Sequence, residues 1–216
     1  MKNTIIFPCR NEEQGLPECL EKAKTITDTE IIVVNNLSTD KSRKIAEDNG
    51  VRVIDTFIKG YGETCRRGIE YAQGENIILV DCDGSYDIDE ARRLIAYLDN
   101  GYDFVIGNRF NEMIEKGAMP FLHRYLGSVF LRTILKNRGW ECKEVSTGFI
   151  GIKKKWLDKM DLECSGMEFS TELILNVIKM NLKVKEIDIV YSKRKGKSKF
   201  RTFIDGARHY WYLMWN

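Results

Sequence analysis

The chain has 216 residues, enough for one domain with a sizeable core and short for two. Its 34 Lys and Arg residues nearly balance 32 Asp and Glu, and the net charge of +2 does not indicate a nucleic acid partner. Six scattered cysteines without a CxxC pair argue against structural zinc, and the apolar runs are far shorter than the about 18 residues that cross a bilayer.

The first half of the chain alternates short apolar runs with amphipathic stretches. The predicted strands cover 4–7, 31–34, 51–54 and 77–80, and the predicted helices begin near Leu16, cover 41–49 and end at Gly74. Pro8 is expected to end the first strand. This alternation predicts βαβ units, hence a mainly parallel sheet with right-handed crossovers. Because the N-terminus leads directly into a strand, we expect no signal peptide and a cytoplasmic location.

The second half is predicted to add three strands and four helices. The strands are expected at 104–106, 149–152 and 184–189, and the helices at 89–100, 121–136, 169–180 and near the C-terminus. The helix at 121–136 is aromatic and basic, which fits either a membrane interface or a core-facing helix. Tyr210, Trp211, Tyr212 and Trp215 would form an interfacial belt if exposed, and packing into the core is the alternative.

The most informative stretch runs from Ile77 to Ser85. Four apolar residues predict a buried strand, and Asp81 and Asp83 follow at its C-terminal end, where open α/β sheets bind ligands. Two carboxylates two residues apart lean to one side of an extended backbone, so a hard cation such as Mg²⁺ or Mn²⁺ suits them. The alternative is a turn in which the aspartates cap the next helix.

Two common nucleotide-binding motifs are absent from the sequence. No GxGxxG follows the first strand and no GxxxxGK[ST] occurs, which argues against dinucleotide oxidoreductases and P-loop enzymes. The turn at Lys59 and Gly60 offers one cation to a phosphate, although glycine turns often have no such role.

Several motifs, taken in order, resemble those of family 2 inverting glycosyltransferases with the GT-A fold. Within that family the chain is most similar to polyprenyl-phosphate glycosyltransferases of the dolichol-phosphate mannose synthase kind. The matching segments are 35–40, 59–62, 81–86, 107–110, 123–128, 166–172 and 196–199. The resemblance implies one α/β domain over 1–216, with a mixed, mainly parallel sheet flanked by helices and amphipathic membrane-facing helices in its C-terminal half.

The resemblance also implies roles for individual residues. Residues 1–110 would bind the nucleotide-sugar donor and 111–216 the acceptor. The donor-binding residues would be Pro8, Arg10, Glu12, Asn36, Lys59, Gly60, Asp81, Cys82 and Asp83, with Asp81 and Asp83 holding Mg²⁺ or Mn²⁺. The acceptor-binding residues would be Arg109, Arg124, Ser128, Glu168, Glu172, Arg194, Lys197, Ser198 and Lys199. The catalytic residues would be Asp83, Arg109 and Arg124.

The chain departs from the family pattern at three points. Asn35 and Asn36 stand where many relatives have aspartates, Cys82 replaces a commoner alanine, and the aspartate that often serves as catalytic base has no obvious counterpart. A lipid phosphate does not need that base, because its second pKa of about 6 leaves it largely anionic at neutral pH. Direct attack on the anomeric carbon would invert the donor's configuration.

The leading hypothesis is therefore a peripheral enzyme on the cytoplasmic face of a membrane that transfers a sugar from a UDP or GDP donor to a polyprenyl or dolichyl phosphate. Three alternatives stay open. The acceptor could be a glycan or lipid hydroxyl, and the chain could be a non-catalytic module that binds nucleotide sugars or anionic lipids. A nucleotidyltransferase has a related sheet, but its glycine-rich, basic first loop is absent.

Overall fold

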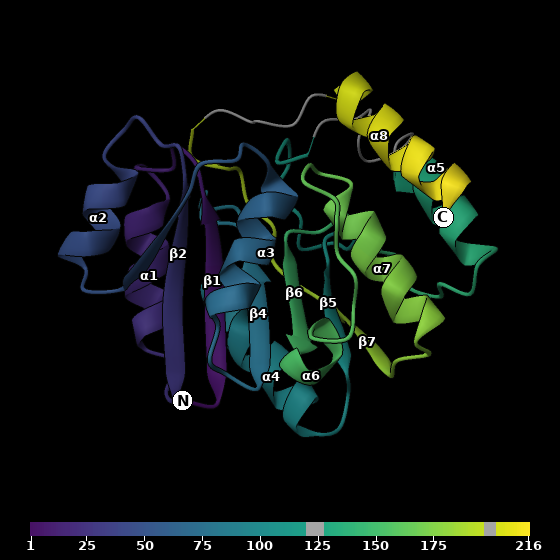
Figure 1. The fold of residues 1–216 in the computed structure, drawn as a ribbon, viewed down its shortest axis with the longest axis horizontal. Coiled ribbons are helices and arrows are strands. Elements are labelled where there is room, and N and C mark those ends of the chain that lie inside the picture. The colour runs from purple at the N-terminus through teal and green to yellow at the C-terminus, as the bar shows by residue number, and fades with distance from the viewer. Residues whose placement is uncertain (120–127, 197–201) are drawn as a thin grey trace.

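The computed structural model describes residues 1–119, 128–196 and 202–216, without the side chains of 128, 202 and 203. Its centre is a seven-stranded sheet in the order β3-β2-β1-β4-β6-β5-β7 (Figure 1). The strands are β1 (Asn3–Cys9), β2 (Thr29–Asn36), β3 (Arg52–Thr56), β4 (Asn76–Val80), β5 (Phe104–Asn108), β6 (Phe149–Lys153) and β7 (Val184–Asp188). All neighbouring pairs are parallel except those that β6 makes with β4 and β5.

Helices cover both faces of the sheet. In chain order they are α1 (Leu16–Lys24), α2 (Ser42–Asp48), α3 (Tyr61–Tyr71), the 3₁₀ helix η1 (Ile88–Glu90), α4 (Ala91–Asp99), α5 (Ser128–Lys136), α6 (Lys154–Leu157), α7 (Phe169–Lys179) and α8 (Thr202–Trp215). In Figure 1, α3 and α7 lie in front of the sheet, while α1 and α4 lie behind it.

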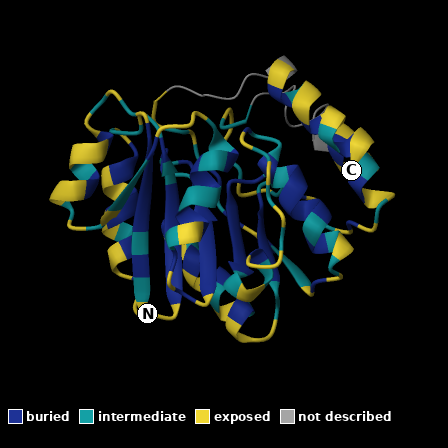
Figure 2. Ribbon diagram, in the orientation of Figure 1, coloured by how far each residue is buried: buried dark blue, intermediate teal, exposed yellow. Residues whose placement is uncertain are grey.

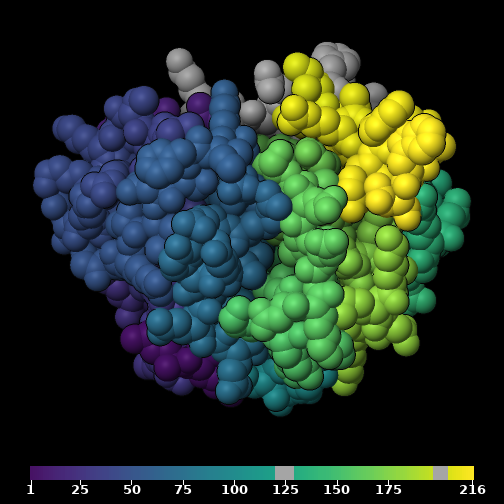
Figure 3. All heavy atoms as spheres, viewed as in Figure 1, coloured from purple at the N-terminus to yellow at the C-terminus, as the bar shows by residue number. Residues whose placement is uncertain are grey.

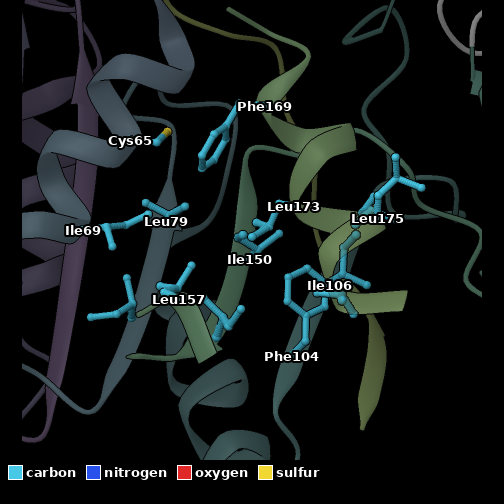
Figure 4. Close-up of a cluster of buried hydrophobic side chains, with 14 of the residues drawn as sticks. Cys65, Ile69, Leu79, Phe104, Ile106, Ile150, Leu157, Phe169, Leu173 and Leu175 are labelled. Atoms are coloured by element: carbon cyan, nitrogen blue, oxygen red, sulfur yellow. The ribbon is translucent and has the colours of Figure 1, made fainter. Parts of the chain in front are cut away.

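Alternating strand residues divide the core into two layers. Ile6 and Leu79 face one side with α3 and α7, and Figure 4 shows Leu79, Phe169 and Leu173 converging there. Ile5 and Val80 face the other side, where they pack with α1 and α4. The five inner strands are buried almost throughout, as expected for a sheet covered on both faces, whereas most residues of the edge strands β3 and β7 are half-buried (Figure 2).

The predicted strands and the mainly parallel sheet are confirmed, with two differences. Pro8 does not end the first strand, because β1 continues to Cys9 and Pro8 pairs with Val34 of β2. The β1–β4 ladder ends at Ile6, two residues earlier, so the missing N–H of Pro8 interrupts nothing on that side. The antiparallel insertion of β6 was not predicted.

The C-terminal helix lies over α7 and α5. Leu213 and His209 are on the buried face of α8, whereas Trp211 and Trp215 of the same helix are 65% and 72% exposed. Figure 2 shows buried and exposed residues alternating along this helix. The aromatic cluster is therefore divided between core and surface. Within the described ranges, none of the helices has the length and apolar character needed to span a bilayer.

Candidate active site

The carboxylates of Asp81 and Asp83 lie at the C-terminal end of β4, near the centre of the sheet. Asp83 is buried, and its Oδ1 accepts hydrogen bonds from the backbone N–H and the hydroxyl of Ser85 at 2.9 and 2.5 Å. Asp81 is half-buried, and its backbone N–H donates to the carbonyl of Gly148 at 3.1 Å. The contacts with Ser85 fix the direction of the Asp83 side chain, and the contact with Gly148 holds the backbone at Asp81.

Two glycines make room for this acidic pair. A Cβ at Gly148, just before β6, would lie 2.1 Å from Oδ2 of Asp81. A Cβ at Gly15, just before α1, would lie 2.5 Å from the carbonyl carbon of Asp83. Real Cβ atoms do not approach so closely, so both positions require glycine in this arrangement.

The electrostatics of the pair favour a cation. Burial, followed by the neighbouring charge of Asp83, raises the pKa of Asp81 to about 7. Arg194 and Arg109 act in the opposite direction, and Glu12 adds to the rise. A divalent ion held by the carboxylates of Asp81 and Asp83 would relieve the repulsion between their charges, so the residues present fit Mg²⁺ or Mn²⁺. No cluster of three or more His, Cys, Asp or Glu ligands occurs in the described part of the chain, so other ligands would complete the coordination.

The segment 191–195, here called the strap, lies along the acidic motif. Arg194 pairs with Oδ2 of Asp83 at 2.8 Å, and the backbone N–H of Lys195 donates to the Asp83 carbonyl at 2.7 Å. Tyr191 contacts Tyr86 edge-to-face, with ring centroids 5.1 Å apart. The guanidinium of Arg194 thus contacts a carboxylate oxygen that a metal ion would also contact.

The donor-binding residues implied by the first two strands also meet at this edge. Asn36 is buried and donates from Nδ2 to the carbonyl of Ile58 at 2.8 Å. The thiol of buried Cys82 lies 3.6 Å from the carbonyl of Pro8. Glu12 lies close enough to affect the pKa of Asp81, and Arg10 is half-buried.

The N-terminus of α3, which follows the turn at Lys59 and Gly60, packs against the loop that precedes α7. The backbone N–H groups of Gly62 and Glu63 donate to the carbonyls of Gly166 and Ser165 at 3.1 and 3.2 Å. A Cβ at Gly60 would lie 2.0 Å from the Ser165 carbonyl oxygen, so the glycine is explained by this close packing. Lys59 remains exposed beside the turn.

Arg109, an implied acceptor-binding residue, is engaged in a buried ion pair. Its Nε and Nη2 donate to the carboxylate of Glu144, both at 2.9 Å, and the Glu144 side chain is fully buried. Burial alone would raise the pKa of Glu144, but Arg109 and backbone donors hold it below its usual value. Because Arg109 lowers the pKa of Asp81, it lies near the acidic pair while bound to another partner.

Glu168 and Glu172 occupy one end of α7 and have different environments. Glu172 is buried, and its carboxylate accepts the backbone N–H groups of Glu163 and Cys164 at 2.8 and 3.1 Å. It therefore holds the loop that covers the start of α3. Oε1 of Glu168 accepts from the N–H of Gly166 at 3.2 Å, while its buried Oε2 has no hydrogen-bond partner among the described residues.

Some implied residues lie outside the described part of the chain. They are Arg124, the side chain of Ser128, Lys197, Ser198 and Lys199. Conversely, the sequence interpretation overlooked Glu144, Gly148 and Gly15. The polar and glycine-containing stretch 144–148 just before an apolar strand is the one signal that could have drawn attention to the first two.

The fold and this acidic edge define a GT-A protein with a candidate nucleotide-sugar site. The sequence profile described as "Glycosyl transferase family 2" matches residues 4–161, and the chain belongs to this family. It is 32% identical to the low-salt glycan biosynthesis hexosyltransferase Agl6 of Haloferax volcanii, over 99% of this chain and 53% of that protein. It is 28% identical to the dolichyl-phosphate hexose transferase of the same organism, over 94% of this chain and 88% of that protein.

Another relative is the dolichol-phosphate mannosyltransferase of Pyrococcus furiosus, 26% identical over 99% of this chain and 64% of that protein. The chain thus spans roughly half to two thirds of several relatives. Among solved structures, glucosyl-3-phosphoglycerate synthase from Mycobacterium tuberculosis in complex with Mn²⁺ and UDP-glucose superimposes with a TM-score of 0.77. The two are 16% identical, and the match covers 99% of this chain and 77% of that one, so the likeness establishes the GT-A fold.

Proposed function

We propose that the protein transfers a sugar from a UDP or GDP sugar to a polyprenyl or dolichyl phosphate, with inversion and with a divalent metal. The observation that carries this proposal is the acidic pair at the end of β4, which combines two carboxylates, a raised Asp81 pKa and a nearby arginine. Two relatives that the chain matches over most of its length are named for dolichyl-phosphate transfer, which supports the acceptor class.

Asp81 and Asp83 would hold the Mg²⁺ or Mn²⁺, and the bound ion would neutralise the departing nucleotide diphosphate. The solved structure with Mn²⁺ and UDP-glucose supports this cofactor class by analogy of fold. Pro8, Arg10, Glu12 and Asn36 surround the same edge and would position the base and ribose. In this division of labour, residues 1–110 bind the donor and 111–216 supply the acceptor side.

Cations beside the acidic pair would hold the acceptor phosphate near the donor. Arg194 is one such cation, because its side chain is 30% exposed and already pairs with Asp83. Arg124 and Lys197 to Lys199 are proposed to join it. Two phosphates repel each other, and guanidinium groups reduce that repulsion while matching phosphate geometry. The lipid phosphate brings its own negative charge, so no side chain has to remove a proton from it.

One observation favours a second candidate function, transfer to a hydroxyl acceptor. Such a reaction needs a base, and Oε2 of Glu168 is a buried carboxylate oxygen to which no hydrogen bond is donated within the described part of the chain. Glu168 also begins the helix whose preceding loop packs on α3. A hydroxyl acceptor reaching this oxygen could lose its proton there.

A lipid acceptor requires the protein to work at a membrane surface, and we propose peripheral association with the cytoplasmic face. The exposed side chains of Trp211 and Trp215, whose rings lie 5.5 Å apart, support such an interface. Phe130 of α5 is 51% exposed and lies against Tyr210 of α8. These residues, with Met214, are called the α8 face below.

The test is a panel of UDP and GDP sugars assayed with a short-chain polyprenyl phosphate and, in parallel, with the matching polyprenol. Transfer to the phosphate alone is expected, and Glu168→Gln should retain this transfer because no proton has to be removed from a lipid phosphate. Transfer to the polyprenol that is lost in Glu168→Gln would establish the second candidate instead. No transfer from any donor to either acceptor would contradict both.

A further inference from the structure

The connection between β3 and α3 carries an exposed apolar tip at the active-site edge. Phe57 is 82% exposed and Ile58 is 60% exposed, and neither packs against a core cluster. The tip follows β3, which is parallel to β2, so it lies at the same sheet edge as the acidic pair. Two adjacent large apolar side chains in water are costly unless something covers them.

The backbone of the tip is held in place. The carbonyl of Ile58 accepts a hydrogen bond at 2.8 Å from Nδ2 of the buried Asn36. At the other end, Gly60 is packed against the Ser165 carbonyl and begins the turn into α3. The fold therefore presents Phe57 and Ile58 outward from two fixed points, which lowers the entropy lost when they bind.

A basic residue, Lys59, directly follows the tip. Lys59 is exposed directly beside it, and within the described ranges neither Lys59 nor Arg10 has an ion-pair partner. Lys195 of the strap is also exposed at this edge, where it pairs with Glu18 at 2.6 Å. An apolar tip with an adjacent unpaired lysine, Lys59, complements a bilayer that contains anionic lipids.

The tip and the α8 face lie along one rim of the molecule. Figure 1 shows the β3–α3 connection and α8 at the upper edge, and Figure 3 shows blue atoms of the N-terminal half and yellow atoms of α8 reaching that rim. The acidic motif, at the end of β4, lies on the same edge of the sheet as the tip. Contacts at both places would point this edge toward the lipid.

We propose that Phe57 and Ile58 insert into an anionic bilayer as a second anchor beside the α8 face, and so orient the active-site edge toward the membrane. This inference rests on the proposed lipid acceptor. Stacking of Phe57 on the donor base is the competing role. It is disfavoured because base pockets are concave and largely preformed, whereas Phe57 is almost fully exposed and its neighbour is exposed as well.

The first experiment measures partitioning onto phosphatidylcholine vesicles with and without phosphatidylglycerol. The double variant Phe57→Ser, Ile58→Ser is expected to bind the anionic vesicles about tenfold more weakly, since it removes two inserted apolar side chains. Met113→Ser, which removes a 44% exposed side chain outside both surfaces, is the control and should bind normally. Unchanged binding of the double variant would overturn the proposal.

A second variant reports on insertion directly. Phe57→Trp, made with Trp211→Phe and Trp215→Phe, places an indole at the tip while Trp140 stays buried and Trp156 stays half-buried. The protein with Trp211→Phe and Trp215→Phe alone supplies the background emission of Trp140 and Trp156. Brominated lipids are expected to quench the emission of the indole at the tip in vesicle-bound protein. Absence of quenching in bound protein would overturn insertion.

Measurements of donor KM and transfer rate distinguish membrane insertion of Phe57 and Ile58 from stacking of Phe57 on the donor base. They also separate a failure of the anchor from a failure of the proposed function. With a water-soluble short-chain acceptor, the double Ser variant should keep the wild-type donor KM, and its loss of rate should appear only with vesicle-borne acceptor. A raised donor KM with both acceptors would assign Phe57 to the base and overturn the anchor. Vesicle binding is measured without turnover, so failure of sugar transfer with normal tip-dependent binding would contradict the proposed function and leave the anchor supported.

Discussion

Two arginine–carboxylate pairs near the active-site edge have opposite characters. Arg109 and Glu144 are 11% and 0% exposed, and two donors of the guanidinium meet the carboxylate. Arg194 is 30% exposed, comes from the strap and forms an ion pair with Asp83 at 2.8 Å. The Arg109–Glu144 pair, called the brace below, is therefore a buried structural ion pair. The Arg194–Asp83 pair is a partly exposed contact that another cation would be able to replace.

The difference follows from what each carboxylate would lose if its arginine left. The side chain of Glu144 is not exposed to solvent, so an unpaired charge on it would be severely destabilising. Asp83 would retain two hydrogen bonds from Ser85, and under the proposed function a metal ion would replace the guanidinium. Exchange of partners is thus possible at Asp83 and prohibited at Glu144.

The largest effect should come from Asp83→Asn. Removing the charge deletes a proposed metal ligand, so transfer should fall by about 10²–10³-fold or more, a loss typical of removed charge stabilisation. The melting temperature should change little, because the amide keeps an acceptor for Ser85. Wild-type turnover in this variant would contradict a catalytic role for the acidic pair.

The brace is tested by stability rather than by activity. Glu144→Ala leaves Arg109 charged and buried, and should lower the free energy of unfolding by about 3–5 kcal/mol in denaturant titrations. Glu47→Ala, which removes an exposed partner of Arg43, is the control and should cost at most about 1 kcal/mol. Equal effects of the two variants would remove the distinction between buried and exchangeable pairs.

The space around Asp81 is tested by Gly148→Ala. A methyl group 2.1 Å from Oδ2 would displace the carboxylate, so Mn²⁺ affinity should fall about tenfold or more, which titration calorimetry can measure. Gly206→Ala, at a position where a Cβ meets no atom within 4 Å, should leave the affinity unchanged. An unchanged affinity in Gly148→Ala would place the metal elsewhere.

The pKa of Asp81 predicts a pH dependence. Because that pKa is raised to about 7, a proton competes with the metal below this pH, and Mn²⁺ affinity should fall by up to about tenfold per pH unit. In metal-free protein the folded state holds the extra proton, so the stability from this group is full below the ordinary value of 3.8 and declines as pH rises toward 7. Asp81→Asn should flatten both profiles, and profiles that persist in that variant would assign them to another group.

The smallest effect tests the exchange at Asp83. Arg194→Ala removes the competing guanidinium, so Mn²⁺ should bind about two- to fivefold more tightly in the absence of nucleotide, a size typical of partly exposed pairs. Lys193→Ala, whose partner is Glu115, is the matched control. Weaker Mn²⁺ binding in Arg194→Ala would show that the arginine supports the metal site instead of competing for it.

Much of the fold could be predicted because strand and helix periodicity is local. The apolar run 77–80 and the acidic residues after it define β4 and the acidic motif without knowledge of any partner. The antiparallel placement of β6 could not be predicted in this way. It depends on a long connection from β5 and on pairing with β4, neither of which leaves a periodic signal.

The site was predictable in its composition and less so in its contacts. Charged residues were assigned to phosphate or sugar by type and position, but type does not reveal a partner. Glu172 binds backbone N–H groups of the 163–164 loop, and Arg109 binds Glu144. Gly60 is likewise required because the Ser165 carbonyl leaves no room for a Cβ.

The sequence by itself determined the alternating α/β architecture and the position of Asp81 and Asp83 at a strand end, because both follow from neighbouring residues. The tertiary structure decided which charges are free to act. It pairs Arg194 with Asp83, buries the ion pair of Arg109 and Glu144, and leaves the tip at Phe57 exposed. Those outcomes depend on burial and on partners distant in the chain, and electrostatic strength is set by both.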